Sequence, residues 1–558
     1  MPPHRQGTPV SQDHYDVIII GSGPGGGAMA HSLAPTGKRI LILERGPYLP
    51  REQANWDSKT VFVDAKYQVD ETWYGADGSS FKPGLHRYVG GNSKVYGAAL
   101  LRLRERDFDE IQHPDGVSPA WPVAYDEFEP YYTAAEQLFH VHGKAGEDPN
   151  EPRRTGDFPY PPVTHEPLIQ GLSDSWATQG LNPFHLPLGI LLDEANGKPK
   201  PTSICIRCDA FDGFPCLLNG KADAQVICID PTLARFPNVT LLTEAYAQRL
   251  ETTPDGKTVQ YVHVERAGGV ERYSADLFVV AGGALSSAQL MLRSHGPGHE
   301  NGLANGSDQV GRNYMRHNQS VLMAFLKQPN TTVFQKTLAC SDFYFGDADY
   351  PYPMGLIQMC ATTHGAQVRG EEVPHWLNSF LPRMPFDLVA RHALDFWLSS
   401  EDLPKPENRI RYDGDRTVLE LRETSLEAHK RLRKKLETIM KAAGCAPFLL
   451  ERNLYLGKGI PVGGTAHQAG TLRFGTDPRS SVLDVNCKAH ELDNLYSTDA
   501  GFFPSIGAVN PTLTIIANAL RVADHLRGRL GVTDRPAAEP AIGNSYVLSG
   551  RSPALQAV

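Results

Sequence analysis

The chain has 558 residues, which is too long for one hydrophobic core and predicts at least two domains. Its 54 Lys and Arg against 63 Asp and Glu give a net charge of -9, which excludes the strongly basic surface of a typical nucleic-acid-binding protein. The sequence contains no run of about 18 apolar residues and no apolar segment of a signal peptide near residue 1. We therefore expect a cytoplasmic protein without a membrane span.

The first predicted elements are a strand, a glycine-rich turn, a short helix and a second strand. Residues 17–20 and 40–43 are continuous apolar runs, as is typical of buried parallel strands. The turn has G-x-G-x-x-G spacing at Gly21, Gly23 and Gly26. Such glycines let a pyrophosphate approach a helix N-terminus, and Glu44, at the end of the second strand, is placed to accept a hydrogen bond from a ribose hydroxyl. The combination predicts a dinucleotide site; the alternative is a glycine-rich turn in an ordinary βαβ unit.

A second glycine pair and several further elements follow along the chain. Gly90 and Gly91, with Asn92 and Ser93, predict a loop that exposes its backbone to a flat cofactor. Residues 121–139 predict a capped helix with Tyr125 and Asp126 before it. Residues 238–252 and 274–294 predict two more parallel strands, the second with a Gly282–Gly283 turn into a helix. An amphipathic helix is expected from about 425 to 443.

These elements predict an α/β fold with a discontinuous cofactor domain. Its Rossmann-like part is expected in residues 15–110, 220–317 and 463–530. A β-sheet-rich substrate domain is expected in residues 111–219 and 318–462. The tail, 533–558, is rich in proline and small residues and is expected to be poorly ordered or to face a partner.

Several of these stretches together resemble one family. They are "DVIIIGSGPGGG", "GGNS", "AWPVAYDEFEPYY", "LFVVAGGALSSAQLML" and the long block from Ala466 to about residue 526. The chain is similar to the glucose–methanol–choline (GMC) family of FAD-dependent oxidoreductases over most of its length. The resemblance implies oxidation of an alcohol by hydride transfer to flavin N5.

The resemblance also implies roles for individual residues. His467 matches the histidine that faces flavin N5 and the alcohol, and Asn510 matches the second member of the family's His–His or His–Asn pair. A neutral imidazole can take the alcohol proton near physiological pH, while an amide can hold the alcohol oxygen. Glu44, Asn92, Ser93 and the glycines named above are expected to bind the cofactor. Further cofactor-binding residues are expected at Arg45, Ala245, Ala281, Gly282, Asp499, Ala500, Pro511 and Thr512.

The sequence departs from some members of the family at Val95. Several members attach FAD covalently to a histidine at this position, so we expect non-covalent FAD here. The His–Asn pair at 467 and 510 resembles that of pyranose-oxidising members more than that of aryl-alcohol-oxidising ones, which implies a sugar or glycoside as substrate. Three alternatives stay open: a lyase with structural FAD, a flavoprotein subunit that passes electrons to a cytochrome, and a binding module with an inactive site. The electron acceptor (oxygen, quinone or cytochrome) and an oligomer or small partner subunit also stay open.

Other residues have more than one interpretation. The group Cys205, Cys208, Cys216 and Cys228 could ligate zinc or an iron–sulfur cluster, but it lacks the second C-x-x-C of a robust four-ligand site. A relic or local disulfide and plain structural cysteines are the favoured interpretations, and no metal is expected. Cys228 lies in a strand-like run. Stacking on a sugar ring and packing in a β-sheet are equally open for the aromatic group Phe343, Tyr344, Phe345, Tyr350 and Tyr352. Three histidines are expected to be structural, and they are His86, His317 and His490.

Overall fold

A computed structural model describes residues 14–373, 381–413, 416–452 and 466–532. The predicted strand–helix–strand unit is present as β1 (His14–Ile20), α1 (Pro24–Leu33) and β2 (Ile40–Leu43). β1 pairs in parallel with β2 on one side and with β15 (Gly269–Val280) on the other. The expected tail at 533–558 lies outside the described residues.

The first large sheet has seven strands in the order β12-β2-β1-β15-β14-β13, with β25 (Leu495–Ser497) also paired to β15. β12 (Val239–Leu242) and β25 extend the parallel part, as expected of buried apolar runs. β13 (Tyr246–Thr252) and β14 (Val259–Arg266) are antiparallel, so only the first part of the predicted 238–252 strand was correctly assigned as parallel.

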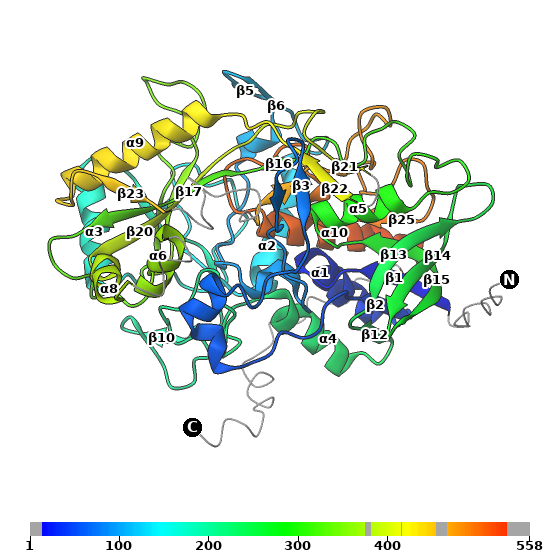
Figure 1. The fold of residues 1–558 in the computed structure, drawn as a ribbon, viewed down its shortest axis with the longest axis horizontal. Coiled ribbons are helices and arrows are strands. Elements are labelled where there is room, and N and C mark those ends of the chain that lie inside the picture. Colours follow the sequence, from blue (N-terminus) through cyan, green and yellow to red (C-terminus); the bar gives the residue numbers. More distant parts are fainter. Residues whose placement is uncertain (1–13, 374–380, 414–415, 453–465, 533–558) are drawn as a thin grey trace.

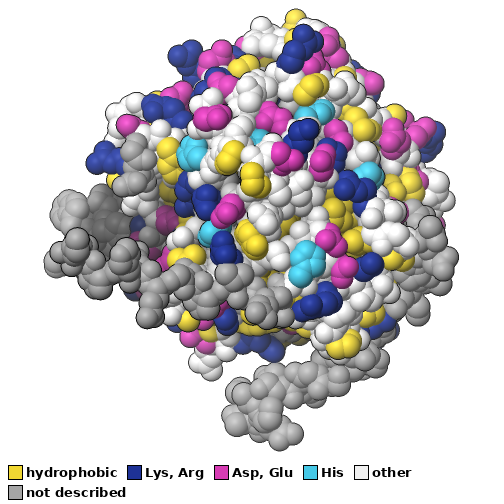
Figure 2. All heavy atoms as spheres, turned by 90° about the vertical axis from the view of Figure 1, so that its right-hand side faces the viewer, with side chains coloured by type: hydrophobic (Ala, Val, Ile, Leu, Met, Phe, Trp, Pro, Cys, Tyr) yellow, Lys and Arg dark blue, Asp and Glu magenta, His cyan; other side chains and the backbone are white. Residues whose placement is uncertain are grey.

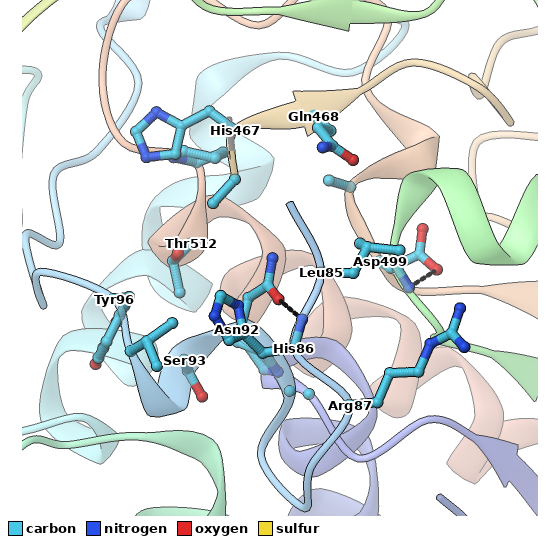
Figure 3. Close-up of a pocket in the computed structure, with 18 of the residues that line it drawn as sticks. Leu85, His86, Arg87, Asn92, Ser93, Tyr96, His467, Gln468, Asp499 and Thr512 are labelled. Atoms are coloured by element: carbon cyan, nitrogen blue, oxygen red, sulfur yellow. Dashed lines mark hydrogen bonds between the residues drawn. The ribbon is translucent and has the colours of Figure 1, made fainter. Parts of the chain in front are cut away.

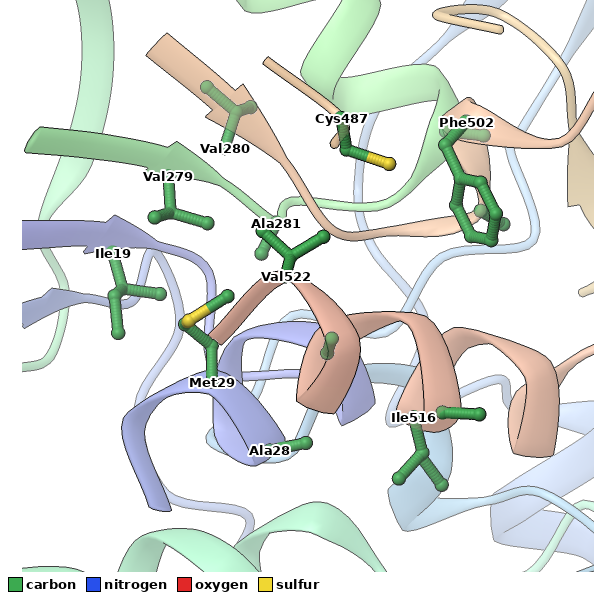
Figure 4. Close-up of a cluster of buried hydrophobic side chains, with 14 of the residues drawn as sticks. Ile19, Ala28, Met29, Val279, Val280, Ala281, Cys487, Phe502, Ile516 and Val522 are labelled. Atoms are coloured by element: carbon green, nitrogen blue, oxygen red, sulfur yellow. The ribbon is translucent and has the colours of Figure 1, made fainter. Parts of the chain in front are cut away.

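Helices α1 and α10 (Thr512–Arg529) pack on this sheet and on each other (Figure 4). Ile19 of β1, Met29 of α1 and Val522 of α10 point into one fully buried cluster. Each buried side chain of this size contributes about 1.5–3 kcal/mol to folding. The glycine-rich start of α1 is thereby held rigidly against the strand ends.

The second large sheet is antiparallel, with the order β23-β17-β20-β19-β18-β8, and lies on the opposite side of the molecule in Figure 1. Its bounds are β8 (Pro183–His185), β17 (Asn318–Phe325), β18 (Leu338–Cys340), β19 (Leu356–Met359), β20 (Ala393–Ser400) and β23 (Leu449–Glu451). Helices α3 (Pro167–Thr178) and α9 (Leu426–Ala442) cover one face. The predicted amphipathic helix is α9, and its Leu432 and Leu436 are fully buried there.

Strand alternation divides the side chains of this sheet between its two faces. Leu322, Ile357 and Phe396 pack in the core under α9 and α3. Their sequence neighbours Val321, Gln358 and Trp397 instead line a cavity on the other face. The sheet therefore separates a hydrophobic core from the wall of the cavity.

A smaller sheet joins distant segments: β21 (Arg409–Asp413), β22 (Arg416–Glu420), β3 (Trp73–Gly75) and β4 (Ser80–Phe81). The helix expected around 121–139 is α2 (Tyr125–Leu138), but Tyr125 and Asp126 lie inside it, and its N-cap, Ala124, makes no side-chain cap hydrogen bond. The turn at Gly283 leads into α5 (Ala284–Arg293) as expected.

The mixed α/β fold class predicted from the sequence is confirmed. The division into two domains stays a prediction. No helix in the described ranges is long and apolar enough to span a bilayer. Lys and Arg side chains are interspersed with Asp and Glu over the face shown in Figure 2.

Candidate active site

A cavity of about 410 Å³ is lined by residues of both large sheets, a size typical of cofactor and small-molecule sites. In Figure 3, Leu85, His86 and Arg87 follow one another along it, with His467 toward one end and Arg87 and Asp499 toward the other. The structure brings nearly all the predicted site residues to this cavity. Those that line it are Gly21, Gly23, Glu44, Arg45, Gly91, Asn92, Ser93, Ala245, Ala281, Gly282, His467, Asp499, Ala500, Asn510, Pro511 and Thr512.

The fingerprint glycines have three different physical roles. Gly21 has φ +109°, and a Cβ there would lie 2.3 Å from the Ala281 carbonyl oxygen. A Cβ on Gly26 would lie 2.0 Å from the Gly21 carbonyl oxygen, so Gly26 permits close packing of helix and strand and does not itself line the cavity. A Cβ on Gly23 would meet no protein atom within 4 Å, although Gly23 lines the cavity. The space in front of Gly23 therefore fits a ligand.

Gly23 is also the N-cap of α1 and makes no side-chain cap hydrogen bond. The first N–H groups of this ten-residue helix are directed to the end where Gly23 meets the cavity, and such groups favour an anion. This arrangement is the one expected for a pyrophosphate.

Two buried carboxylates lie along the cavity at strand ends. Glu44 follows β2 and accepts hydrogen bonds from Ser22 N (3.1 Å), Ser22 Oγ (2.6 Å) and Gly46 N (2.9 Å). Asp499 follows β25 and accepts from Gly283 N (2.9 Å), Gly501 N (2.8 Å) and Ser287 Oγ. Burial raises the pKa of both carboxyl groups, while these donors favour the charged forms. Both are held as rigid acceptors.

Arg45 lies beside Glu44 and is fixed by two neighbours. Its guanidinium stacks 3.7 Å above the Tyr246 ring centroid and donates to Glu71 Oε1 at 2.6 Å. Glu71 also accepts from Arg87. Arg45 lines the cavity as expected, and its contact with a cofactor stays a prediction.

His467 comes just before β24 (Gln468–Ala469), which pairs with β16 (Met315–Arg316). The two strands are antiparallel and Arg316 is opposite Gln468. The residue after Arg316 is therefore opposite the residue before Gln468. His317 and His467 are in contact for this reason, with 2.9 Å between their Nδ1 atoms. Gln319 Nε2 lies 2.5 Å from the same His467 nitrogen.

Asn510 precedes α10, and its amide orientation is set by Gln358 of β19. Gln358 Nε2 donates to Asn510 Oδ1 at 3.0 Å. This contact occupies the carbonyl side of Asn510 and leaves its NH₂ group to donate into the cavity. The side chain can therefore stabilise an oxygen that gains negative charge.

Lys336 adds a positive charge to the same end of the cavity. It is buried, and its Nζ donates to Asp212 Oδ1 at 2.5 Å. Gly97 allows this close packing, because a Cβ there would lie 1.8 Å from Asp212 Oδ1 and 2.1 Å from Lys336 Nζ. Desolvation lowers the pKa of His467 well below 6.5, and the neighbouring His317 and Lys336 lower it further. The imidazole is therefore neutral and able to accept a proton.

Sequence reasoning missed several residues at this end. His317 was expected to be structural, and although it is fully buried it contacts His467 directly. Gln319, Gln358 and Lys336 were not singled out. These residues are about 110 to 150 positions from His467 in sequence, and only strand pairing brings them together. Neither β17 (NQSVLMAF) nor β19 (LIQM) alternates polar and apolar residues, so no local pattern marked these positions.

The other two histidines thought to be structural differ from each other. His490 hydrogen-bonds Ser481 Oγ at 2.9 Å and does not line the cavity. His86 lines the cavity, and burial lowers its pKa to about 4. Its backbone N–H donates to Asn92 Oδ1 at 2.8 Å, which fixes the loop that contains Gly91.

The aromatic group near residue 345 does not support the sugar-stacking hypothesis, since none of its five members lines the cavity. Tyr344 is buried, donates to Asp107 Oδ2 and accepts from Ala508 N, both at 2.8 Å. Tyr350 and Tyr352 pack edge to face. These rings lie in and beside the loop between β18 and β19, where they have a packing role.

The cysteine group contains four free thiols. Cys228 is fully buried but lies in a π-helical turn, Gln225–Ile229, and not in a strand as expected. There it packs against Gly27 of α1. Over the ranges that the structure describes, no cluster of three or more His, Cys, Asp or Glu side chains is arranged to hold a metal ion.

Comparisons with known proteins agree with this geometry. Family models described as GMC oxidoreductase match residues 191–319 and 399–519. The chain is 30% identical over 550 residues to 6'''-hydroxyparomomycin C oxidase of Streptomyces lividus, covering 94% of each chain. It is 29% identical to paromamine 6'-oxidase of Streptomyces fradiae, covering 95% of this chain and 94% of the relative.

A solved structure of pyridoxine 4-oxidase from Mesorbium loti has the same fold, with a TM-score of 0.62 and 20% identity, over 92% of this chain and 99% of that one. The family resemblance and the enzyme class expected from the sequence are confirmed. The chain belongs to the GMC oxidoreductases, a family of FAD-binding flavoproteins, and is an oxidoreductase that acts on CH–OH groups.

Proposed function

We propose that the protein oxidises a CH–OH group of a sugar, glycoside or related alcohol, with non-covalent FAD as cofactor and His467 as base. The observation that carries this proposal is the continuity of one cavity from the open space at Gly23 to the His467–Asn510 end. A dinucleotide cofactor and a substrate can therefore meet in it.

The residues present fit FAD. The open space at Gly23 and the N-terminus of α1 suit the pyrophosphate, and Glu44 and Asp499 would accept hydrogen bonds from hydroxyl groups of the cofactor. When bound, FAD supplies the two-electron acceptor for the oxidation. Val95, an aliphatic residue, lines the same cavity.

The protein side chains remove the substrate proton and stabilise the substrate oxygen. His467, neutral because of its buried surroundings, takes the proton of the substrate hydroxyl. The Asn510 NH₂ group donates to the oxygen as negative charge develops on it. Both groups are fixed before substrate arrives, by His317 and Gln358 respectively, so little orientation entropy is lost in the reaction.

The cavity wall supports a sugar or glycoside as the substrate. Trp397 offers an aromatic side chain close to His467, with 6.2 Å between ring centroids. Gln358 and Thr362 each have a buried polar atom, Oε1 and Oγ1, without a hydrogen-bond partner within the described ranges. Such atoms suit a ligand rich in hydroxyl groups. Among the relatives, one is named fructose dehydrogenase large subunit, from Gluconobacter japonicus.

An anaerobic spectral screen tests this function. The holoenzyme is mixed with sugars, glycosides, amino sugars and simple alcohols, and the flavin absorbance is followed with and without oxygen. Bleaching by a sugar or glycoside supports the proposal, and recovery of the yellow colour in air identifies oxygen as an acceptor. Product formation without bleaching would indicate a lyase with structural FAD, and bleaching only by simple alcohols would contradict the sugar assignment.

Non-covalent attachment is tested by denaturation. Acid or heat is expected to release intact FAD into the supernatant, because Val95 offers no nucleophile to the cofactor. The supernatant is analysed for FAD by fluorescence and mass. Flavin that remains with the precipitated polypeptide would contradict the expectation and direct the search for a linkage to His86, which also lines the cavity.

Replacing Lys336 with methionine is expected to move the acid limb of the flavin-reduction rate to higher pH. His467 must be unprotonated to act, and the ammonium group disfavours its protonated form. Removing that charge raises the folded-state pKa of His467 toward 6.5, so protonation and loss of rate begin at a higher pH. Stopped-flow reduction measures the limb over a range of about pH 4 to 8, which brackets the ordinary imidazole pKa. Lys336→Arg keeps the charge and is the matched control; an unmoved limb in Lys336→Met would count against this coupling.

A further inference from the structure

His317 and His467 form a hydrogen-bonded pair whose protons can be assigned from the partners of each ring. His317 Nδ1 lies 2.9 Å from His467 Nδ1, and its Nε2 lies 2.9 Å from the Gly507 carbonyl oxygen. The rings are nearly perpendicular, at 85°. Each contact requires one proton between its two heavy atoms.

A carbonyl oxygen can only accept, so Nε2 of His317 carries a proton. His317 is fully buried, and desolvation lowers its pKa to about 4, although the Gly507 carbonyl and Glu401 raise it somewhat. The ring is therefore neutral near pH 7 and has a lone pair on Nδ1. The proton between the two rings must then belong to His467 Nδ1.

The protonation state of the other His467 ring nitrogen, Nε2, follows from this assignment. Both hydrogen bonds that the described residues make to this ring involve Nδ1. A neutral His467 with its proton on Nδ1 has a lone pair on Nε2. His467 lines the cavity, so that lone pair is the base that the oxidation requires.

We propose that His317 is a positioning residue that fixes His467 in the Nδ1–H tautomer and leaves Nε2 free to take the substrate proton. This inference rests on the proposed role of His467 as the base. It also implies that the Gln319 amide presents its oxygen, and not its nitrogen, to His467 Nδ1, since that nitrogen already carries a proton. The opposite tautomer of His467 would require a doubly protonated His317 inside the protein.

The tautomer can be measured without a substrate. The holoenzyme is labelled with ¹⁵N-histidine, and two-bond ¹H–¹⁵N correlations distinguish a protonated from an unprotonated ring nitrogen. The signals of His467 are those lost in His467→Gln. The expected result near pH 7 is a protonated Nδ1 and an unprotonated Nε2. A protonated Nε2 would overturn the proposal.

Two variants of His317 test whether this residue sets the tautomer. His317→Asn places an amide oxygen, which is an acceptor, near the position of the His317 Nδ1 atom. This variant is therefore expected to keep His467 in the Nδ1–H form. His317→Leu removes the acceptor and is expected to give a mixture of both tautomers. An unchanged tautomer in His317→Leu would show that Gln319 or another group fixes the ring.

Kinetics separate this role from a structural one. Once a substrate has been identified, His317→Leu is expected to reduce flavin at least tenfold more slowly than His317→Asn, with similar substrate affinity. If the tautomer is as proposed but His467→Gln reduces flavin normally, the proposed function of His467 fails while the tautomer assignment stands. If the folded His317→Leu protein cannot be obtained, the wild-type tautomer tests the proton assignment, and loss of the Nδ1–H form in His317→Asn would contradict the positioning role.

Discussion

Replacing His467 with glutamine is expected to lower the rate of flavin reduction by about 10²- to 10⁴-fold, the range typical of a lost general base. Glutamine fills a similar volume but cannot accept the proton at neutral pH. Bound FAD is expected to be retained, because the glycine cradle and Asp499 are unaffected. Anaerobic stopped-flow absorbance measures the rate, and the flavin-to-protein ratio measures retention.

Two variants give this experiment its controls. His490→Gln changes a histidine outside the cavity and is expected to reduce flavin at the wild-type rate. Asn510→Ala is expected to cost less than His467→Gln, since it removes a hydrogen-bond donor and leaves the base in place. Reduction at close to wild-type rate by His467→Gln would move the role of base to another group or to water.

Replacing Gly23 with alanine is expected to weaken FAD binding by at least tenfold and to leave the fold of the apoprotein intact. The new methyl group would meet no protein atom within 4 Å, but would occupy space next to the free N–H groups of α1. Flavin fluorescence titration of the apoprotein measures the affinity, and thermal unfolding of the apoprotein measures stability.

Gly25→Ala is the matched comparison. Its Cβ would lie 2.1 Å from the Thr498 carbonyl oxygen, so the helix or the β25 end must shift, and the apoprotein itself is expected to lose stability. Equal effects of the two substitutions on the apoprotein would contradict the assignment of the space at Gly23 to a ligand.

Local pattern was sufficient to predict the strand–helix–strand unit at one end of the cavity. The glycine spacing, two apolar runs and a terminal acid lie within 30 residues, and β1, α1 and β2 appear where they were expected. Gly26 alone fell outside the cavity, because its role is to permit close approach to Gly21. Steric requirements between residues close in sequence can therefore be predicted from the spacing of glycines and apolar residues.

The substrate half was less predictable for a physical reason. His317 reaches His467 only through pairing of β16 with β24, and Gln358 reaches Asn510 across a separate sheet. No local periodicity encodes such pairings between distant segments. The aromatic cluster around Tyr344 shows the same limit, since its composition left sugar stacking and packing equally open, and the structure places it outside the cavity.

The two-faced sheet formed by β17, β19 and β20 has a consequence for how this enzyme can change. Val321, Gln358 and Trp397 face the cavity, whereas their immediate neighbours pack under α9 and α3. A substitution on the cavity side therefore alters the shape and hydrogen bonding of the wall without creating a void in the hydrophobic core. Selection for a new substrate can thus act on alternate positions of three strands while the others preserve the scaffold, which makes this wall the natural target for libraries that seek altered specificity.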